Sequence, residues 1–96
     1  MVKPQFEVGR DNVGAGGVVR DPKLRVAAIV QVAQAAIGLG LSLWAITASP
    51  LPGPSGNVEY FIAMSREPRF PKLDDIEAAA IEAVQNGPQA GVADGK

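Results

Sequence analysis

Residues 21–48 decide the fold and read DPKLRVAAIVQVAQAAIGLGLSLWAITA. The first two residues form a helix start. The Asp21 side chain can accept hydrogen bonds from free helical amides, and Pro22 lacks the amide that would go unpaired at the first helical position. We therefore predict a helix over residues 22–37. Its apolar residues recur at helical spacing, at Leu24, Ala28, Ile29, Val32, Ala33 and Ala36.

A strand is predicted directly after this helix. Gly38 or Gly40 can end the helix, because glycine readily adopts the left-handed conformation that closes a helix C-terminus. In residues 41–48, both alternating sets of side chains are largely apolar. Such a strand is typical of a sheet that is covered on both faces.

The rest of the chain extends this pattern in both directions. In order we expect an extended stub at residues 1–8, a flexible glycine-rich loop at 9–21, a stiff proline loop at 50–57, a strand at 58–64, a helix at 73–85 and a disordered tail at 89–96. Two strands are too few for a stable sheet in water. The chain therefore looks like the closing part of an α/β sheet whose earlier strands are missing.

The composition excludes several kinds of chemistry. The 96 residues include no cysteine and no histidine, and the formal net charge is −1. Disulfides, thiol nucleophiles, imidazole bases and metal sites built on Cys or His are excluded, and we expect no bound metal. Carboxylates, lysine and tyrosine remain for acid–base chemistry. The charge is also not that of a strongly basic nucleic-acid binder.

A membrane span is the main challenge to this interpretation. Residues 26–48 carry no charge, and this run is longer than the ~20 residues that a spanning helix needs. Gln31 and Gln34 would lack partners in lipid, and glycines at 38 and 40 divide the run. We therefore favour a helix followed by a strand.

Two charged residues and one glycine segment stand out. Lys3 lies near the expected carboxyl end of a strand, where α/β enzymes place functional groups. Glu59 is the only charge between Val26 and Met64. The glycine segment at residues 14–22 lacks the lysine and Ser/Thr ending of a phosphate loop, so we interpret it as a mobile connection. The alternative is that the helix N-terminus after it meets a nucleic-acid phosphate.

Three segments together resemble a known family. They are VKPQFEVG at residues 2–9, GGVVRDP at 16–22 and SPLPGPSGNVEYF at 49–61. In this order and spacing they are similar to the C-terminal part of the TlyA (haemolysin A) family. Members are ribosomal-RNA cytidine 2′-O-methyltransferases with an FtsJ/RrmJ-like fold.

The resemblance implies a Rossmann-like, S-adenosylmethionine-dependent methyltransferase sheet of the α/β class. Residues 1–88 would be the C-terminal part of this domain, with residues 89–96 as its tail. Lys3 would close the fifth strand and residues 22–37 would form the crossover helix. The sixth strand and an antiparallel seventh, which lies between the fifth and the sixth, would follow before the terminal helix.

The resemblance also implies site residues. The family uses a Lys-Asp-Lys-Glu tetrad, in which Lys3 matches the second lysine and Glu59 the glutamate. A ribose 2′-hydroxyl is a poor nucleophile, so a lysine that takes its proton and a glutamate that orients both groups suit this chemistry. Arg20 and Asn57 are weaker candidates for substrate binding.

What the chain lacks limits its expected function. The first tetrad lysine, the aspartate and the glycine-rich S-adenosylmethionine loop would all precede Met1, so no cofactor-binding residue is assigned here. We expect a cytoplasmic protein section that is inactive alone and that acts on ribosomal RNA or ribosomal subunits in a longer context. Two alternatives stay open: a non-enzymatic α/β unit that docks or self-associates, and a membrane-active haemolysin-like polypeptide.

Overall fold

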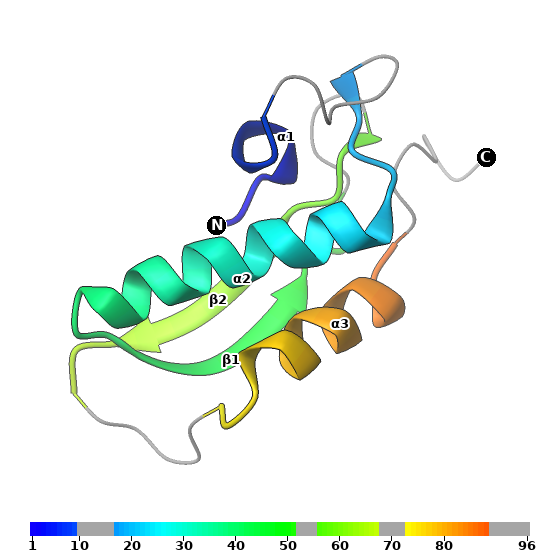
Figure 1. The fold of residues 1–96 in the computed structure, drawn as a ribbon. Helices are drawn as coiled ribbons and strands as arrows, with labels where there is room; N and C mark the ends of the chain where they lie inside the picture. Colours follow the sequence, from blue (N-terminus) through cyan, green and yellow to red (C-terminus); the bar gives the residue numbers. More distant parts are fainter. Residues whose placement is uncertain (10–16, 52–55, 68–72, 89–96) are drawn as a thin grey trace.

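The computed structural model describes residues 1–9, 17–51, 56–67 and 73–88 and contains helices and strands in an α/β arrangement (Figure 1). In chain order, these are α1 (Pro4–Glu7), α2 (Pro22–Gly38), β1 (Ser42–Ala48), β2 (Tyr60–Ser65) and α3 (Ile76–Asn86). The predicted α/β class and the succession of long helix, strand, strand and helix are confirmed.

The start and end of α2 follow the predicted signals. The Asp21 carboxylate accepts a hydrogen bond from the Lys23 amide at 2.9 Å, and Pro22 occupies the first turn. Gly40 has a φ of +88°, the left-handed conformation predicted for the glycine after the helix. The buried face of α2 consists of Arg25, Ala28, Ile29, Ala33 and Ala36, so a charged residue joins the predicted apolar set.

The strands form an antiparallel pair to which the N-terminus adds a third row. In β1 and β2, Thr47 lies opposite Phe61 and Ala48 lies opposite Tyr60. On its other side, Tyr60 forms an isolated antiparallel bridge with Val2. The start of β2 therefore lies between β1 and the N-terminal segment, in agreement with an antiparallel strand inserted between two others.

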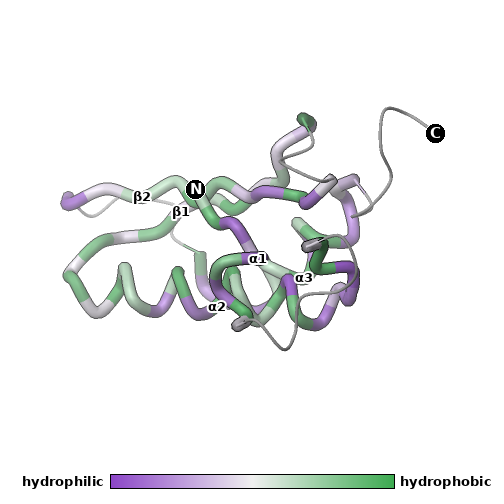
Figure 2. Tube along the Cα trace, turned by 90° about the horizontal axis from the view of Figure 1, so that it is seen from above, coloured by the Kyte–Doolittle hydropathy of each residue, from purple (hydrophilic) through white to green (hydrophobic). Residues whose placement is uncertain are grey.

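The helices cover only one face of this sheet. Figure 2 shows the strands on one side of the molecule and α2 and α3 together on the other. Two core clusters lie between these layers: the first is Val2, Ala28, Ile29, Val58, Tyr60, Ala80, Ala83 and Val84, and the second is Ala33, Ala36 and Leu43. The prediction that β1 is covered on both faces is wrong for the part of the chain described here, which supplies a single helical layer. On the open face, Phe61 is 44% exposed.

The N-terminal region is more ordered than predicted. Within the expected extended stub, Val2 forms a β-bridge and Lys3 has an extended backbone, because a residue before proline is pushed away from the helical region. Pro4 then starts the short helix α1, since its fixed φ suits a first helical position. The prediction of a flexible loop is also wrong for residues 17–20, because Val18 and Val19 are buried. Residues 10–16 of that loop lie outside the described residues.

The starts of β2 and α3 differ from the predicted positions. Two other predicted segments cannot be compared, because they lie wholly or partly outside the described residues. The strand predicted from residue 58 begins at Tyr60, and the helix predicted from residue 73 begins at Ile76. Asp75 sets the second boundary, because its side chain accepts a hydrogen bond from the Ala78 amide at 3.0 Å. The predicted tail at 89–96 and half of the predicted proline loop, residues 52–55, lie outside the described residues.

The uncharged run is divided between two elements. Its first part belongs to α2 and its last part to β1, with Gly40 between them. Across the described ranges, every helix is too short or too polar to cross a bilayer.

Gly87 should not tolerate a side chain. A Cβ atom at this position would lie 2.5 Å from the Ala48 Cβ and 2.9 Å from the Ala83 carbonyl oxygen. We expect Gly87→Ala to lower the free energy of unfolding by about 1–3 kcal/mol, because α3 must shift away from β1. Urea unfolding followed by the fluorescence of the single tryptophan measures this loss.

Gly38→Ala is the matched control. Gly38 lies in α2, and a Cβ there meets no atom within 4 Å. Since alanine favours a helix over glycine, this variant should gain about 0.5–1 kcal/mol. If both variants changed stability in the same direction, the close approach at Gly87 would not be the cause.

Candidate active site

Backbone pairing brings Lys3 and Glu59 together. The Val2 amide donates to the Tyr60 carbonyl oxygen at 2.6 Å, and the Tyr60 amide donates to the Val2 carbonyl oxygen at 3.0 Å. In an antiparallel ladder, the pair next to such a doubly bonded pair has its side chains on the opposite face and close together. Lys3 and Glu59 form that next pair, so their side chains point away from the face that Tyr60 buries.

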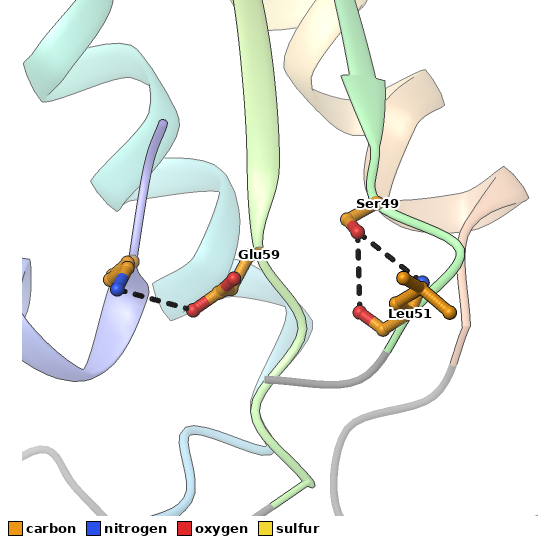
Figure 3. A network of polar contacts seen from close by, with 4 residues as sticks. Ser49, Leu51 and Glu59 are labelled. Carbon is orange, nitrogen blue, oxygen red and sulfur yellow. Dashed lines mark hydrogen bonds and ion pairs between the residues drawn. The ribbon is translucent and has the colours of Figure 1, made fainter. Parts of the chain in front are cut away.

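The two side chains form a partly buried ion pair. The Lys3 Nζ lies 3.7 Å from the Glu59 Oε2, and the side chains are 39% and 12% exposed. Figure 3 marks this contact with a dashed line at Glu59. The Oε2 atom is buried and accepts no hydrogen bond from the described residues, since 3.7 Å exceeds hydrogen-bonding distance. It therefore retains acceptor capacity for another donor.

A turn at the end of β1 holds the backbone of Glu59. The Ser49 amide donates to the Glu59 carbonyl oxygen at 2.8 Å. The Ser49 hydroxyl in turn donates to the Leu51 carbonyl oxygen and accepts from the Leu51 amide, at 3.2 and 3.3 Å (Figure 3). The Glu59 carboxylate points away from this turn and toward Lys3.

Asn57 holds the glycine segment in place. Its Oδ1 accepts from the Val19 amide at 3.0 Å, and its Nδ2 donates to the Gly17 carbonyl oxygen at 2.8 Å. The residue is only 2% exposed. These contacts show that Asn57 supports the loop, and its substrate binding stays a prediction. Arg20, at the end of the same segment, lies exposed on the surface.

A second buried contact was not predicted. Arg25 is 6% exposed and donates from Nη1 to the Tyr60 hydroxyl at 3.1 Å, and from Nη2 to the Arg20 carbonyl oxygen at 3.4 Å. Its Nε is buried and has no acceptor in the described part of the chain. The sequence could have predicted this burial from helical spacing, because Arg25 lies one turn before Ile29 on the buried face of α2.

Ionisation of Tyr60 makes the fold less stable at alkaline pH. Burial raises the pKa of the Tyr60 hydroxyl, while the charge and hydrogen bond of Arg25 act to lower it. The unfolded chain therefore releases this proton first as the pH climbs past about 10. Stability that is fully present below that pH is then lost as the pH rises toward the higher folded pKa.

We expect the free energy of unfolding to fall between pH 9 and 11 more steeply in the parent chain than in Tyr60→Phe. Urea titrations at each pH measure the difference. Tyr60 is the only tyrosine, so the ultraviolet absorbance of the phenolate follows this group alone. Equal slopes for the two chains would contradict the assignment.

The described part of the glycine segment is packed into the fold. Val18 and Val19 are 2% and 1% exposed, and the Asn57 side chain forms hydrogen bonds with the backbone of Gly17 and Val19. A cavity of about 510 Å³ lies elsewhere, between β1 and the end of α3, and it is lined by Ile46, Thr47, Ala48, Pro50, Glu82, Ala83, Asn86, Gly87 and Pro88. Neither Lys3 nor Glu59 lines it.

Comparison with known proteins identifies relatives of this arrangement. Over 89 residues the chain is 48% identical to the 16S/23S rRNA (cytidine-2′-O)-methyltransferase TlyA of Mycobacterium tuberculosis, covering 92% of this chain and 33% of that protein. Hemolysin A of Brachyspira hyodysenteriae is 38% identical over 60 residues, which are 62% of this chain and 25% of that one. The chain thus spans about a third or less of these relatives.

A solved structure and a family model complete the comparison. A candidate hemolysin from Lactococcus lactis superimposes with a TM-score of 0.71 at 36% identity, over 84% of this chain and 39% of that one. Residues 1–66, which include Lys3, Asn57 and Glu59, match the model of the FtsJ-like methyltransferases. This chain therefore belongs to the FtsJ-like methyltransferase family.

Proposed function

We propose that this chain is the C-terminal section of a ribosomal-RNA cytidine 2′-O-methyltransferase, in which Lys3 and Glu59 act on the ribose hydroxyl. The observation that carries the proposal is the 3.7 Å approach of the Lys3 Nζ to a Glu59 oxygen that accepts no hydrogen bond from the described residues. The name of the Mycobacterium tuberculosis relative supports the substrate class.

In this mechanism Lys3 is the base and Glu59 the orienting group. As a base, Lys3 acts in its deprotonated form: Nζ takes the proton of the ribose 2′-hydroxyl, so an O–H bond breaks and an N–H bond forms. Glu59 orients the lysine and the hydroxyl by hydrogen bonding, and its buried Oε2 has no donor among the described residues. S-adenosylmethionine, the methyl donor of FtsJ-like methyltransferases, supplies the electrophilic methyl group.

Arg20 is our candidate for an RNA contact outside the reacting atoms. Its side chain is exposed on the surface, and its carbonyl oxygen is held by the buried Arg25. An exposed guanidinium on a fixed backbone suits a phosphate of the RNA chain, which positions the nucleic acid and carries no sequence information. Asn57 is better used as a support for this segment than as a substrate ligand, because both atoms of its amide are bonded.

We infer that the rest of the active site comes from the portion of the longer relatives that this chain does not span. The open face of the sheet supports this division, since Phe61 remains 44% exposed there. The remainder would supply the other two tetrad residues and the cofactor loop. A ribosomal substrate would place the complete enzyme in the cytoplasm.

The chain alone should not transfer a methyl group. With labelled S-adenosylmethionine and ribosomal subunits, we expect no label in the RNA and no heat of cofactor binding by calorimetry. A chimaera in which residues 1–88 replace the matching third of the Mycobacterium tuberculosis relative should be active. Turnover by the isolated chain, or an inactive chimaera that is folded, would count against the proposal.

Self-association is a second role that one observation favours. The open sheet face, on which Phe61 is exposed, can pair two copies or bind the rest of a longer chain. Sedimentation of the isolated chain separates these cases. A stable dimer that the rest of the relative cannot dissociate would favour a non-enzymatic association unit over an enzyme section.

A further inference from the structure

The contacts on either side of Glu59 converge on one short segment, residues 17–20. Asn57, two positions before Glu59, binds Gly17 and Val19. Tyr60, the next residue, binds Arg25, which also binds the carbonyl oxygen of Arg20. The backbone that carries the candidate glutamate is therefore tied on both sides to the same four residues.

Burial of the Arg25 guanidinium costs free energy that an apolar side chain at this position would not cost. A guanidinium that is 6% exposed has lost most of its hydration, and within the described ranges it forms no ion pair. Its two hydrogen bonds are to neutral oxygens, and its Nε has no acceptor there. Apolar side chains commonly replace such buried charges without loss of stability. The arrangement therefore suits a role in positioning better than one in stability.

Tyr60 connects Arg25 with the backbone pairing that places Lys3 opposite Glu59. Its backbone is the partner of Val2, and this pairing alone places Lys3 opposite Glu59. Its side chain ends at Arg25 on the first turn of α2. A shift of the Tyr60 side chain thus moves the backbone that sets the distance from Lys3 to Glu59.

We propose that Arg25 is a positioning residue of the active site, which holds Tyr60 and residues 17–20 so that Lys3 and Glu59 face each other. The inference rests on the proposed function only for its catalytic consequence. Its geometric part concerns the 96-residue chain itself.

The first test measures geometry in the isolated chain. Amide hydrogen exchange by NMR should be at least about 10-fold faster at Val2 and Tyr60 in Arg25→Met and Tyr60→Phe than in the parent, because each of these amides donates to the carbonyl oxygen of the other residue. Ala36→Gly is the control, since Ala36 is buried in the second core cluster and the substitution weakens α2 by helix propensity. Exchange at Val2 and Tyr60 that changes no more than in this control would overturn the proposal.

The second test measures turnover in the chimaera. Arg25→Met and Tyr60→Phe should lower kcat by about 10- to 100-fold, with little change in the KM for ribosomal subunits, because a small displacement of catalytic groups affects the reacting step. Arg25→Lys should recover part of kcat, since one ammonium can reach one of the two oxygens but does not bridge both. Ala36→Gly should leave kcat unchanged below its melting temperature.

The outcomes separate the two proposals. If Lys3→Ala and Glu59→Ala abolish turnover while the Arg25 and Tyr60 variants keep a normal kcat, the positioning role is wrong and the proposed function stands. If the parent chimaera is folded but inactive, the proposed function is wrong, and the exchange rates decide the geometric proposal. A kcat loss equal to that of Ala36→Gly would also overturn the positioning role.

Discussion

Lys3→Ala and Glu59→Ala, each made in the chimaera with the Mycobacterium tuberculosis relative, should lower methyl transfer by about 100-fold or more. Lys3 is the base in the proposed mechanism, and removal of a positioned base costs about two to four orders of magnitude. Glu59 orients the lysine and the hydroxyl through an oxygen that the described residues leave open. Incorporation of labelled methyl groups into ribosomal RNA, under single-turnover conditions, measures the loss.

These two variants should stay folded. The ion pair is partly buried, with side chains 39% and 12% exposed, so loss of either partner should cost about 1–3 kcal/mol out of a total of about 5–15 kcal/mol. Lys23→Ala and Glu82→Ala are matched controls, because both residues are exposed and lie on α2 and α3. These controls should keep full turnover. Near-normal activity in Lys3→Ala or Glu59→Ala would remove that residue from the mechanism.

Tyr60→Ala should unfold much of the chain. The Tyr60 side chain is fully buried in the first core cluster, so truncation loses about 3–5 kcal/mol through the cavity and the lost apolar contacts. A domain of this length has a total stability of only about 5–15 kcal/mol. Circular dichroism should show a marked loss of secondary structure, and the midpoint of urea unfolding should fall.

Phe61→Ala provides the control on the neighbouring residue. Phe61 also lies in β2, but its ring is 44% exposed on the open face of the sheet. We expect a loss of about 1 kcal/mol or less, since most of that apolar surface already contacts water. Equal losses at the two positions would contradict the one-sided packing of the sheet.

Local signals predicted the main elements well. Asp21 and Pro22 start α2 as expected, and Gly40 adopts the left-handed conformation after its end. These features depend on neighbouring residues, which a sequence displays directly. The resemblance of three segments supplied the rest of the fold class, which the family match confirms.

The errors arose where distant parts of the chain meet. Val18 and Val19 are buried, and Asn57 holds this segment from far along the chain, whereas glycine content alone suggested flexibility. The burial of Arg25 was not predicted, since the buried tyrosine that it contacts lies on β2. The uncovered face of β1 was missed because apolar alternation shows what a strand can bury, not which layer is present.

The bridge between Val2 and Tyr60 has a consequence for the order of folding. It joins the beginning of the chain to a residue well beyond its middle, and such distant contacts are slow to form because a large loop must close first. During synthesis, Lys3 leaves the ribosome long before Glu59 exists. A nascent chain that ends before β2 therefore has every residue of α2 and β1 but lacks the Lys3–Glu59 ion pair, which can form only when the start of β2 is held beside Val2.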